Sequence, residues 1–285
     1  MSESEQKKSR QNRYPASDGN GYYVYCIAER SLAEELTLGK TPESIEEGAG
    51  LELIKTPNLA AIVSRVPMTA YGESALAENL TDPTWTAVRA MRHEHVVEYF
   101  SKQTSVVPLR FGTIYLDQSG IERMLSERAE QLAAIIQRLE GREEWGVNVY
   151  SDRAVLMENI VTVSTRLREM SESAKQASPG QSYLLKKKIE ALRSDEAKVE
   201  IKRLIGQIEE KLRTESDDVS KLRILKVETT DHGELKAKFA FLVRRSQFES
   251  FRNVAEELAQ DLASAGIRLE LTGPWPAYNF ATGND

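Results

Sequence analysis

The sequence predicts an α+β protein with two domains of ferredoxin-like character, each a β-α-β sandwich, together with a helical hairpin. Three observations lead to this prediction. Short β-branched or alternating segments recur in both halves of the chain, and segments with helical periodicity separate them. Two long, highly charged stretches between the halves also have helical spacing, and Ser178-Pro179-Gly180 separates them.

Strands are expected in the first half where apolar residues alternate or run together, at residues 22–28, 51–55, 59–65, 106–115 and 145–151. Pro57-Asn58 suits a hairpin turn between the second and third of these, and Gly112 suits a bend within the fourth. This order of strands, interrupted by two helices, approximates a β-α-β-β-α-β sandwich.

Helices are expected in the first half at residues 83–103 and 121–139. Thr81 or Asp82 can cap the first, with Pro83 in its first turn. Its apolar face is expected to carry Trp85, Val88, Met91, His95, Val96 and Tyr99. Residues 31–38 fit a short helix or a loop, and residues 68–82 a polar loop.

The second half is expected to begin with helices at residues 153–177 and 183–213. The apolar phase of the second helix slips near residues 199–201, so an antiparallel hairpin is favoured over an uninterrupted coiled coil. Strands at 222–229, 235–243 and 267–271 and a helix at 247–265 complete the chain. The turn between the first two strands is placed at residues 231–233, and Gly266 is the expected helix stop.

Four segments follow from this order of elements. Residues 1–21 are too polar to offset their ordering entropy and are expected to form a disordered tail. Residues 22–151 are expected to form an N-terminal α+β domain, and residues 152–218 the helical hairpin. Residues 219–285 are expected to supply C-terminal strands, a helix and an aromatic tail.

Composition excludes several classes of function. The chain has a net charge of −6, whereas nucleic-acid binding usually needs a basic surface, so no nucleic-acid partner is expected. No apolar run approaches the roughly 20 residues that span a bilayer, so no membrane partner is expected. A single cysteine, Cys26, fits a reducing cytoplasm, and the charged N-terminus lacks the apolar stretch of a signal peptide.

Motifs for catalysis are missing from the sequence. His93 and His95 lie two residues apart, on different sides of the expected helix, so they cannot share one metal ion from that element alone. His95 and Glu98 share a face of the helix, but no third ligand is evident. Cys26 lies in an apolar strand, where thiols are usually inert. The sequence has no glycine-rich phosphate loop, nucleophile elbow or zinc spacing. We therefore expect no enzyme activity, no cofactor and no metal.

Two rigid aromatic segments are the candidate partner-binding or structural motif. Residues 106–115 read Val-Val-Pro-Leu-Arg-Phe-Gly-Thr-Ile-Tyr, and residues 271–280 read Leu-Thr-Gly-Pro-Trp-Pro-Ala-Tyr-Asn-Phe. The residues singled out are Pro108, Arg110, Phe111, Gly273, Pro274, Trp275, Pro276, Tyr278 and Phe280.

Each of these residues has two interpretations. The prolines should stop residues 271–280 from continuing a strand, so the rings anchor either the core or a partner. We expect the Trp275 ring to close the C-terminal domain and leave Tyr278 and Phe280 open. Arg110 is expected in mostly buried surroundings, either in a structural ion pair or against a partner.

Both aromatic segments resemble signatures of the gas vesicle protein family GvpL/GvpF, which has a Pro-Leu-Arg-Phe-Gly-Thr-like segment and a Gly-Pro-Trp-Pro-Pro-Tyr-like segment. Residues 22–28, 144–150 and 183–188 resemble further family segments in the same order, so the likeness spans residues 22–280. The chain departs from the pattern at Ala277, where a second proline is common, and in its longer polar N-terminus.

The resemblance implies an accessory protein of gas vesicle assembly, located in the cytoplasm and at the gas vesicle. The implied partner is the hydrophobic shell protein GvpA, with other gas vesicle proteins possible. Such a protein would act as a chaperone or as a minor structural component. The alternative is a small-molecule-binding or catalytic α+β protein of unknown substrate, because a fold does not decide a function.

Overall fold

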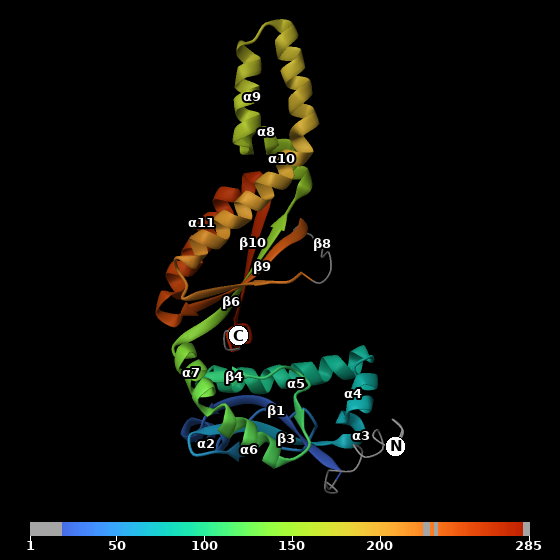
Figure 1. Ribbon diagram of the computed structural model, residues 1–285, viewed down its shortest axis with the longest axis vertical. Helices are drawn as coiled ribbons and strands as arrows, with labels where there is room; N and C mark the ends of the chain where they lie inside the picture. Colours follow the sequence, from blue (N-terminus) through green and yellow to red (C-terminus); the bar gives the residue numbers. More distant parts are fainter. Residues whose placement is uncertain (1–18, 225–228, 231–232, 282–285) are drawn as a thin grey trace, which may run out of the picture. The chain divides into compact units, whose positions relative to one another are not determined.

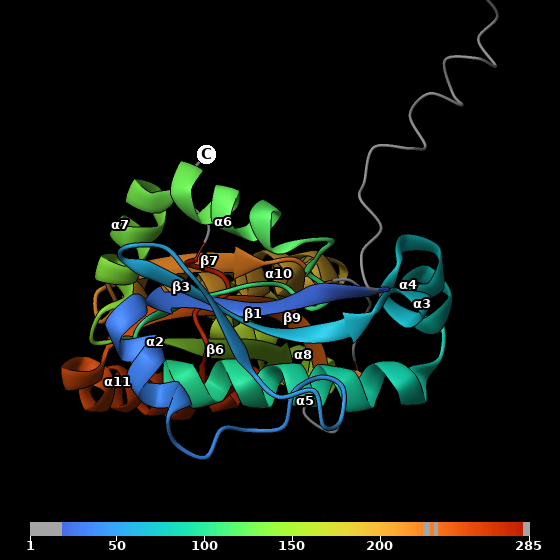
Figure 2. The same ribbon diagram turned by 90° about the horizontal axis from the view of Figure 1, so that it is seen from below.

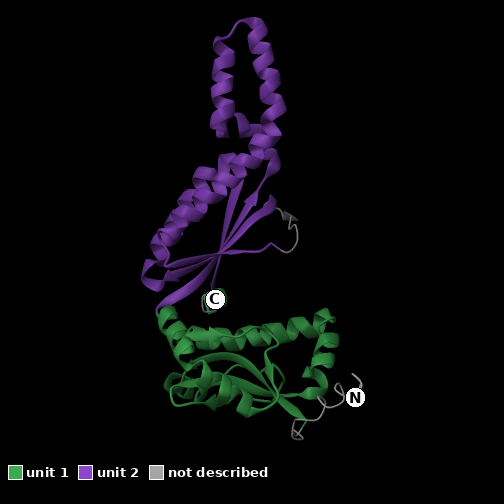
Figure 3. Cartoon of the chain, viewed as in Figure 1, with its two compact units in different colours: residues 1–140, 276–285 green, residues 141–275 purple. Residues whose placement is uncertain are grey.

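The computed structural model describes residues 19–224, 229–230 and 233–281 of the chain. The chain forms two compact units, residues 1–140 with 276–285 (unit 1) and residues 141–275 (unit 2) (Figure 3). These limits differ from the expected segments, since residues 142–151 and the hairpin belong to unit 2 and the last residues belong to unit 1. Most of the expected N-terminal tail lies outside the described residues.

Unit 1 is built on an antiparallel sheet in the order β2-β3-β1-β4, with β5 also paired to β1. Its strands are β1 (Asn20–Glu29), β2 (Glu52–Lys55), β3 (Leu59–Pro67), β4 (Val106–Pro108) and β5 (Ile114–Tyr115). Nearly every residue of β1 and β3 is buried because helices cover both faces of the sheet. In Figure 2, α6 and α7 lie on one face and α2 and α5 on the other.

The helices of unit 1 are α2 (Arg30–Thr37), α3 (Met68–Tyr71), α4 (Glu73–Asn79), α5 (Pro83–Ser101), α6 (Gln118–Glu127) and α7 (Ala129–Leu139). Two expectations were wrong here. The segment expected as a polar loop contains α3 and α4, and the helix expected over residues 121–139 is divided at Arg128. The Asp82 carboxylate caps α5 as expected, accepting from the amides of Thr84 (2.8 Å) and Trp85 (3.3 Å).

The buried face of α5 is rotated from the expected one. Its fully buried residues are His93, Val96, Val97 and Phe100. Val88 and Met91, which were expected in the core, are 43% and 61% exposed. The prediction failed because a polar residue, His93, occupies the buried face, while aliphatic residues occupy the exposed one.

Unit 2 has a second antiparallel sheet, in the order β10-β6-β9-β7 with β8 paired to β9. Its strands are β6 (Arg142–Ser151), β7 (Asp218–Leu222), β8 (Thr229–Thr230), β9 (Gly233–Arg244) and β10 (Ile267–Trp275). The expected turn at residues 231–232 lies outside the described residues. Two antiparallel sheets with helices packed on them confirm the α+β class (Figure 1).

One face of the second sheet is covered by α11 (Phe248–Leu262) and the C-terminal half of α10 (Pro179–Arg213) (Figure 1). Phe239 and Phe241 of β9 pack there with Phe251 of α11. Short 3₁₀ turns, Arg245–Gln247 and Ala263–Ala265, flank α11. Gly266 then ends this helical segment in the left-handed conformation (φ 70°), as expected.

The helical hairpin consists of α8 (Arg153–Val163) and α9 (Thr165–Gln176) packed on the N-terminal half of α10. Its small core contains Leu156, Ile160, Leu167, Ile189 and Ala197. α10 runs through 35 residues without a break despite the slip in its apolar phase. The apolar side chains of its N-terminal half pack in the hairpin core, and those of its C-terminal half pack on the sheet.

Candidate functional site

The two aromatic segments singled out in the sequence come together in unit 1 only in part. Residues 276–281 belong to unit 1, and Tyr278 among them packs, partly buried, against the core that Phe111 also contacts. Pro276 and Phe280 are buried. Gly273, Pro274 and Trp275 belong instead to unit 2.

Tyr278 is held by a series of hydrogen bonds through a fully buried histidine. The His93 Nδ1 atom lies 2.9 Å from the Tyr23 hydroxyl, and His93 Nε2 lies 3.0 Å from the Tyr278 hydroxyl. The Tyr278 hydroxyl donates to Glu94 Oε1 (3.0 Å), and the Gly112 amide donates to the Tyr23 hydroxyl (3.0 Å). Residues from β1, α5, the β4–β5 loop and the C-terminal segment are thus linked.

The directions of these bonds define one tautomer of His93. Because Tyr278 donates its only proton to Glu94, its oxygen must accept from His93 Nε2–H. Nδ1 of the neutral ring is then the acceptor, so Tyr23 donates to it while accepting from Gly112. Every hydroxyl and ring nitrogen in the series has a partner, as buried polar groups require.

The rings around His93 are packed as well as hydrogen-bonded. Tyr25 stacks on His93 with ring centroids 5.8 Å apart, and Phe111 meets it edge-on at 5.8 Å. Tyr278 stacks at 6.5 Å. Phe111 is therefore a core residue that supports His93.

The electrostatics of this cluster favour a neutral imidazole at His93. Burial lowers the pKa of His93 to about 4, although a backbone hydrogen bond at Leu109 opposes the shift. Burial raises the pKa of Glu94, with a further increase from Glu98, while the hydrogen bond from Tyr278 opposes it. Burial also raises the pKa of Tyr278. The imidazole is thus neutral near pH 7.

Acid should destabilise the protein through His93. The pKa of this residue is about 4 when folded and 6.5 in the unfolded reference, so between these values only the unfolded chain binds the proton. Stability is therefore full above pH 6.5 and falls with pH, by about 2 kcal/mol between pH 7 and pH 5. Glu94, with its raised pKa, contributes in the opposite direction. Urea unfolding of the protein and a His93→Gln variant at both pH values isolates the histidine effect, and parallel pH profiles would contradict it.

Beside this cluster lies a groove of about 600 Å³ within unit 1. Its lining combines the β4 segment, the start of α7 and the last described residues: Ile27, Val107, Pro108, Leu109, Arg110, Thr113, Arg128, Gln131, Leu132, Tyr278, Asn279 and Ala281. The expectation of a mostly buried Arg110 in a structural ion pair was wrong, while its alternative, a contact with a ligand or a partner protein, stays a prediction. Its side chain is exposed and forms no ion pair or hydrogen bond with any other described residue.

Trp275 does not close a core as expected. Its side chain is 53% exposed, and its indole Nε1 donates to Thr272 Oγ1 (3.2 Å). The prolines also failed to end the strand, because β10 continues to Trp275 across an irregularity in register after Thr272. Gly273 permits this path with φ of 123°. The expectation for Trp275 was thus wrong, and Phe280, whose role was left open, is the buried ring of this segment.

Sequence reasoning missed His93 and Tyr23 as the organising residues. His93 was considered only as a metal ligand, and Tyr23 only as part of a strand. The spacing of His93, Val96, Val97 and Phe100 at three and four positions was the available signal. Within the described residues, no group of three His, Cys, Asp or Glu side chains could hold a metal ion. Burial raises the pKa of the Cys26 thiol.

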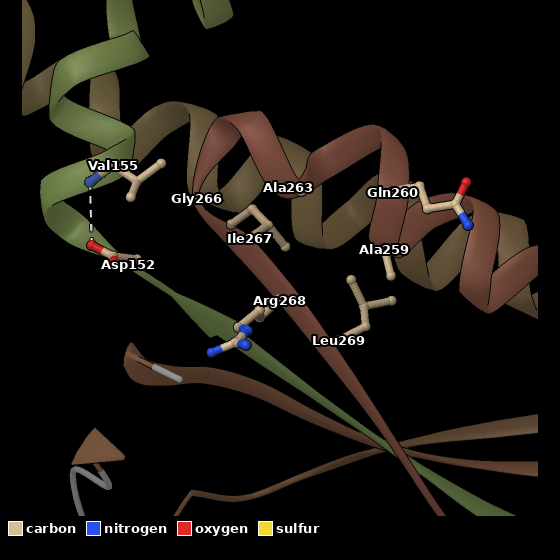
Figure 4. A pocket seen from close by; sticks show the side chains of 9 residues that line it. All are labelled: Asp152, Val155, Ala259, Gln260, Ala263, Gly266, Ile267, Arg268 and Leu269. Carbon is tan, nitrogen blue, oxygen red and sulfur yellow. Dashed lines mark hydrogen bonds between the residues drawn. The ribbon is translucent and has the colours of Figure 1, made fainter. Parts of the chain in front are cut away.

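A second hollow, of about 520 Å³, lies in unit 2 between β10, α8 and the end of α11 (Figure 4). Small and aliphatic side chains line most of it. Its acidic residue, Asp152, already caps α8 by accepting from the amides of Ala154 (2.9 Å) and Val155 (3.2 Å). No helix in the described part of the chain is long and apolar enough to cross a membrane.

Comparison with known proteins gives the family. The model of the family described as gas vesicle synthesis protein GvpL/GvpF matches residues 21–282. The chain belongs to the GvpL/GvpF family. This membership supports a role in gas vesicle formation.

Several family members are similar to the chain over most of their length. Gas vesicle protein L of Streptomyces sp. (strain CB03234) is 30% identical over 80% of this chain and 82% of that protein. Gas vesicle protein L1 of Halobacterium salinarum is 24% identical over 92% and 90%. The crystal structure of GvpF from Anabaena sp. PCC7120 has a TM-score of 0.62 at 16% identity, covering 93% of this chain and 98% of that one. GvpF from Microcystis aeruginosa has a TM-score of 0.56 at 17% identity, covering 92% and 99%.

Proposed function

We propose that this GvpL/GvpF protein acts in gas vesicle assembly by binding the hydrophobic shell protein GvpA, as a chaperone for shell subunits or as a minor component of the shell. The family match over residues 21–282 is the observation that carries the proposal. Shell subunits expose apolar surface before they polymerise, and such surface aggregates unless it is covered. Contacts with other gas vesicle proteins and a cytoplasmic, vesicle-associated location belong to the same proposal.

Exposed apolar side chains of unit 1 support an apolar contact. Val88 and Met91 are 43% and 61% exposed, and they lie three positions apart on the exposed face of α5. Neighbouring apolar side chains that form a contiguous exposed patch are typical of protein-binding sites. We propose no catalytic role, cofactor, metal or nucleic-acid partner.

Tagged protein co-expressed with GvpA is expected to retain GvpA through washes at about 0.5 M salt. Apolar burial is little screened by salt, whereas the Debye length at this concentration is only about 4 Å. Immunoblotting of the eluate measures the retained GvpA. A Val88→Gln, Met91→Gln variant should retain less, while an Arg123→Gln variant serves as the control, because Arg123 is exposed on α6, on the other side of the sheet from α5.

Two results would contradict parts of the proposal. Complete loss of GvpA at about 0.5 M salt would place the contact on charged side chains, with the helical hairpin as the first candidate. A stoichiometric small molecule in native mass spectrometry of the purified protein, without any GvpA retention, would favour the ligand-binding alternative. Immunoblotting of washed vesicles separates the two roles, because only a shell component stays with them.

A further inference from the structure

We propose that the groove of unit 1 binds a peptide segment of a partner protein in which a carboxylate side chain stands next to aliphatic side chains. The inference deepens the proposed function and rests on it only for the identity of the partner. The groove is the place where residues from both aromatic segments, Pro108 with Arg110 and Tyr278, meet in space.

The charge of the groove selects a carboxylate. Its charged lining residues are Arg110 and Arg128, and no aspartate or glutamate lines it. The Arg110 guanidinium is unpaired within the described structure, and Arg128 uses only its Nε, which donates to Gln131 Oε1 (3.0 Å). Guanidinium groups bind carboxylates through two parallel hydrogen bonds, and a carboxylate would supply the acceptors that both arginines lack.

Arginines elsewhere in unit 1 show the contrast. The Arg89 Nε atom lies 2.8 Å from Glu46 Oε1, and Arg92 lies within 4 Å of Glu43 and Glu47. In a protein with 44 acidic and 38 basic residues, the groove brings two arginines together with no acidic residue in its lining. Charge complementarity therefore points to an acidic partner at this groove.

The walls of the groove select a peptide rather than a small anion. Aliphatic side chains also line the groove: Val107 and Leu132 are 4% and 1% exposed, and Leu109 is half-buried. A small anion at the arginines would leave the half-buried Leu109 and most of the 600 Å³ uncovered. Aliphatic side chains beside the carboxylate would cover both. Pro108 has no N–H to donate, so recognition rests on side chains rather than on a regular added strand.

The groove is also held in a fixed shape. Its β4 wall is paired with β1 and continues with the Leu109 amide donating to the Tyr25 carbonyl (2.9 Å). Its Tyr278 wall is held by His93 and Glu94. A site that needs little reordering loses less free energy on binding.

Other hollows offer no such chemistry. In the hollow lined by Glu29, Arg30 and Glu34, the Arg30 Nε atom is already 3.0 Å from Glu34 Oε1. The Ser31 hydroxyl donates a hydrogen bond to the Glu29 carboxylate. In the hollow of Figure 4, Asp152 serves as a helix cap and Arg268 has interactions within the protein. The groove beside Tyr278 differs because the Arg110 guanidinium has no partner among the residues that the structure describes.

The test selects a random peptide library, displayed on phage, on the full-length protein. Enriched peptides are expected to carry Asp or Glu next to Leu, Ile or Val. Their affinity, measured by fluorescence anisotropy of the synthetic peptides, should fall about 10-fold or more in Arg110→Glu and Arg128→Glu variants. Arg123→Glu on α6, an exposed arginine outside the groove, is the matched control and should bind as the unmodified protein does.

Several outcomes would overturn the inference. Enriched peptides without carboxylates would do so, as would equal affinity for the unmodified protein and both groove variants. Circular dichroism confirms that each variant is folded, and Arg110→Gln replaces any that is not. If GvpA binds the Arg110→Glu, Arg128→Glu protein undiminished, the groove is not its site and the proposed function stands. If acidic peptides bind as expected but GvpA does not, the groove stands and the proposed function fails.

Discussion

Replacing His93 by alanine is expected to destabilise unit 1 by roughly 3–5 kcal/mol. The ring is fully buried, and it contacts Tyr25, Phe111 and Tyr278. The variant loses these contacts and leaves the hydroxyl of Tyr23 without its acceptor and that of Tyr278 without its donor. A cavity and unsatisfied buried polar groups are two of the mechanisms that give large losses of stability.

His95 provides the matched control, because it lies on the same helix and its side chain is exposed. The His95→Ala variant should stay within about 0.5 kcal/mol of the unmodified protein. Hydrogen exchange of peptides from β1 and α5, followed by mass spectrometry, reports on unit 1 separately from unit 2. Similar protection of these peptides in the two variants would show that the histidine bridge does not stabilise unit 1.

Replacing Phe280 by alanine should cost roughly 3–5 kcal/mol, whereas Trp275→Ala should cost about 1 kcal/mol or less. The two rings lie five positions apart in one segment, but the Phe280 side chain is 3% exposed and that of Trp275 is 53% exposed. The larger ring therefore has the smaller expected effect. Trp275 can lose its hydrogen bond to Thr272 without leaving a buried cavity.

Calorimetric melting of both full-length variants measures this difference. Tyr278→Phe is a useful third variant, since it keeps the ring and removes only the hydroxyl between His93 and Glu94, for an expected loss of about 1–2 kcal/mol. A lowered melting temperature for Trp275→Ala together with an unchanged melting temperature for Phe280→Ala would contradict the assignment of Phe280 as the stabilising ring and Trp275 as the exposed one.

Local sequence patterns predicted most of the helices and strands, but they did not predict which strands pair with one another. The strand around Trp145 was expected from alternation, and it was assigned to the first half because it follows those elements in sequence. Its pairing with β9 and β10 places it in unit 2. Such pairings join residues far apart in the chain, and a local periodicity carries no information about which distant strand will bond to it.

The same limit applies to the candidate site. Helical spacing predicted α5 correctly. A prediction of its buried face from apolar residues alone was wrong, because Val88 and Met91 are exposed and His93 is buried. A histidine can enter a core when both ring nitrogens find partners, and those partners come from β1 and from the end of the chain. Arg110 was expected to have an acidic partner, yet the chain folds so that none of the described residues reaches it.

The sequence by itself determined the α+β class, the helical hairpin and the resemblance to the GvpL/GvpF family, since these depend on residue order and local periodicity. The tertiary structure alone decided that the chain returns to unit 1 after Trp275, that His93 joins Tyr23 to Tyr278, and that the Arg110 guanidinium remains unpaired among the described residues. The physical reason is that burial and hydrogen bonding depend on which distant segments meet, and a side chain's chemistry fixes only what it needs when they do.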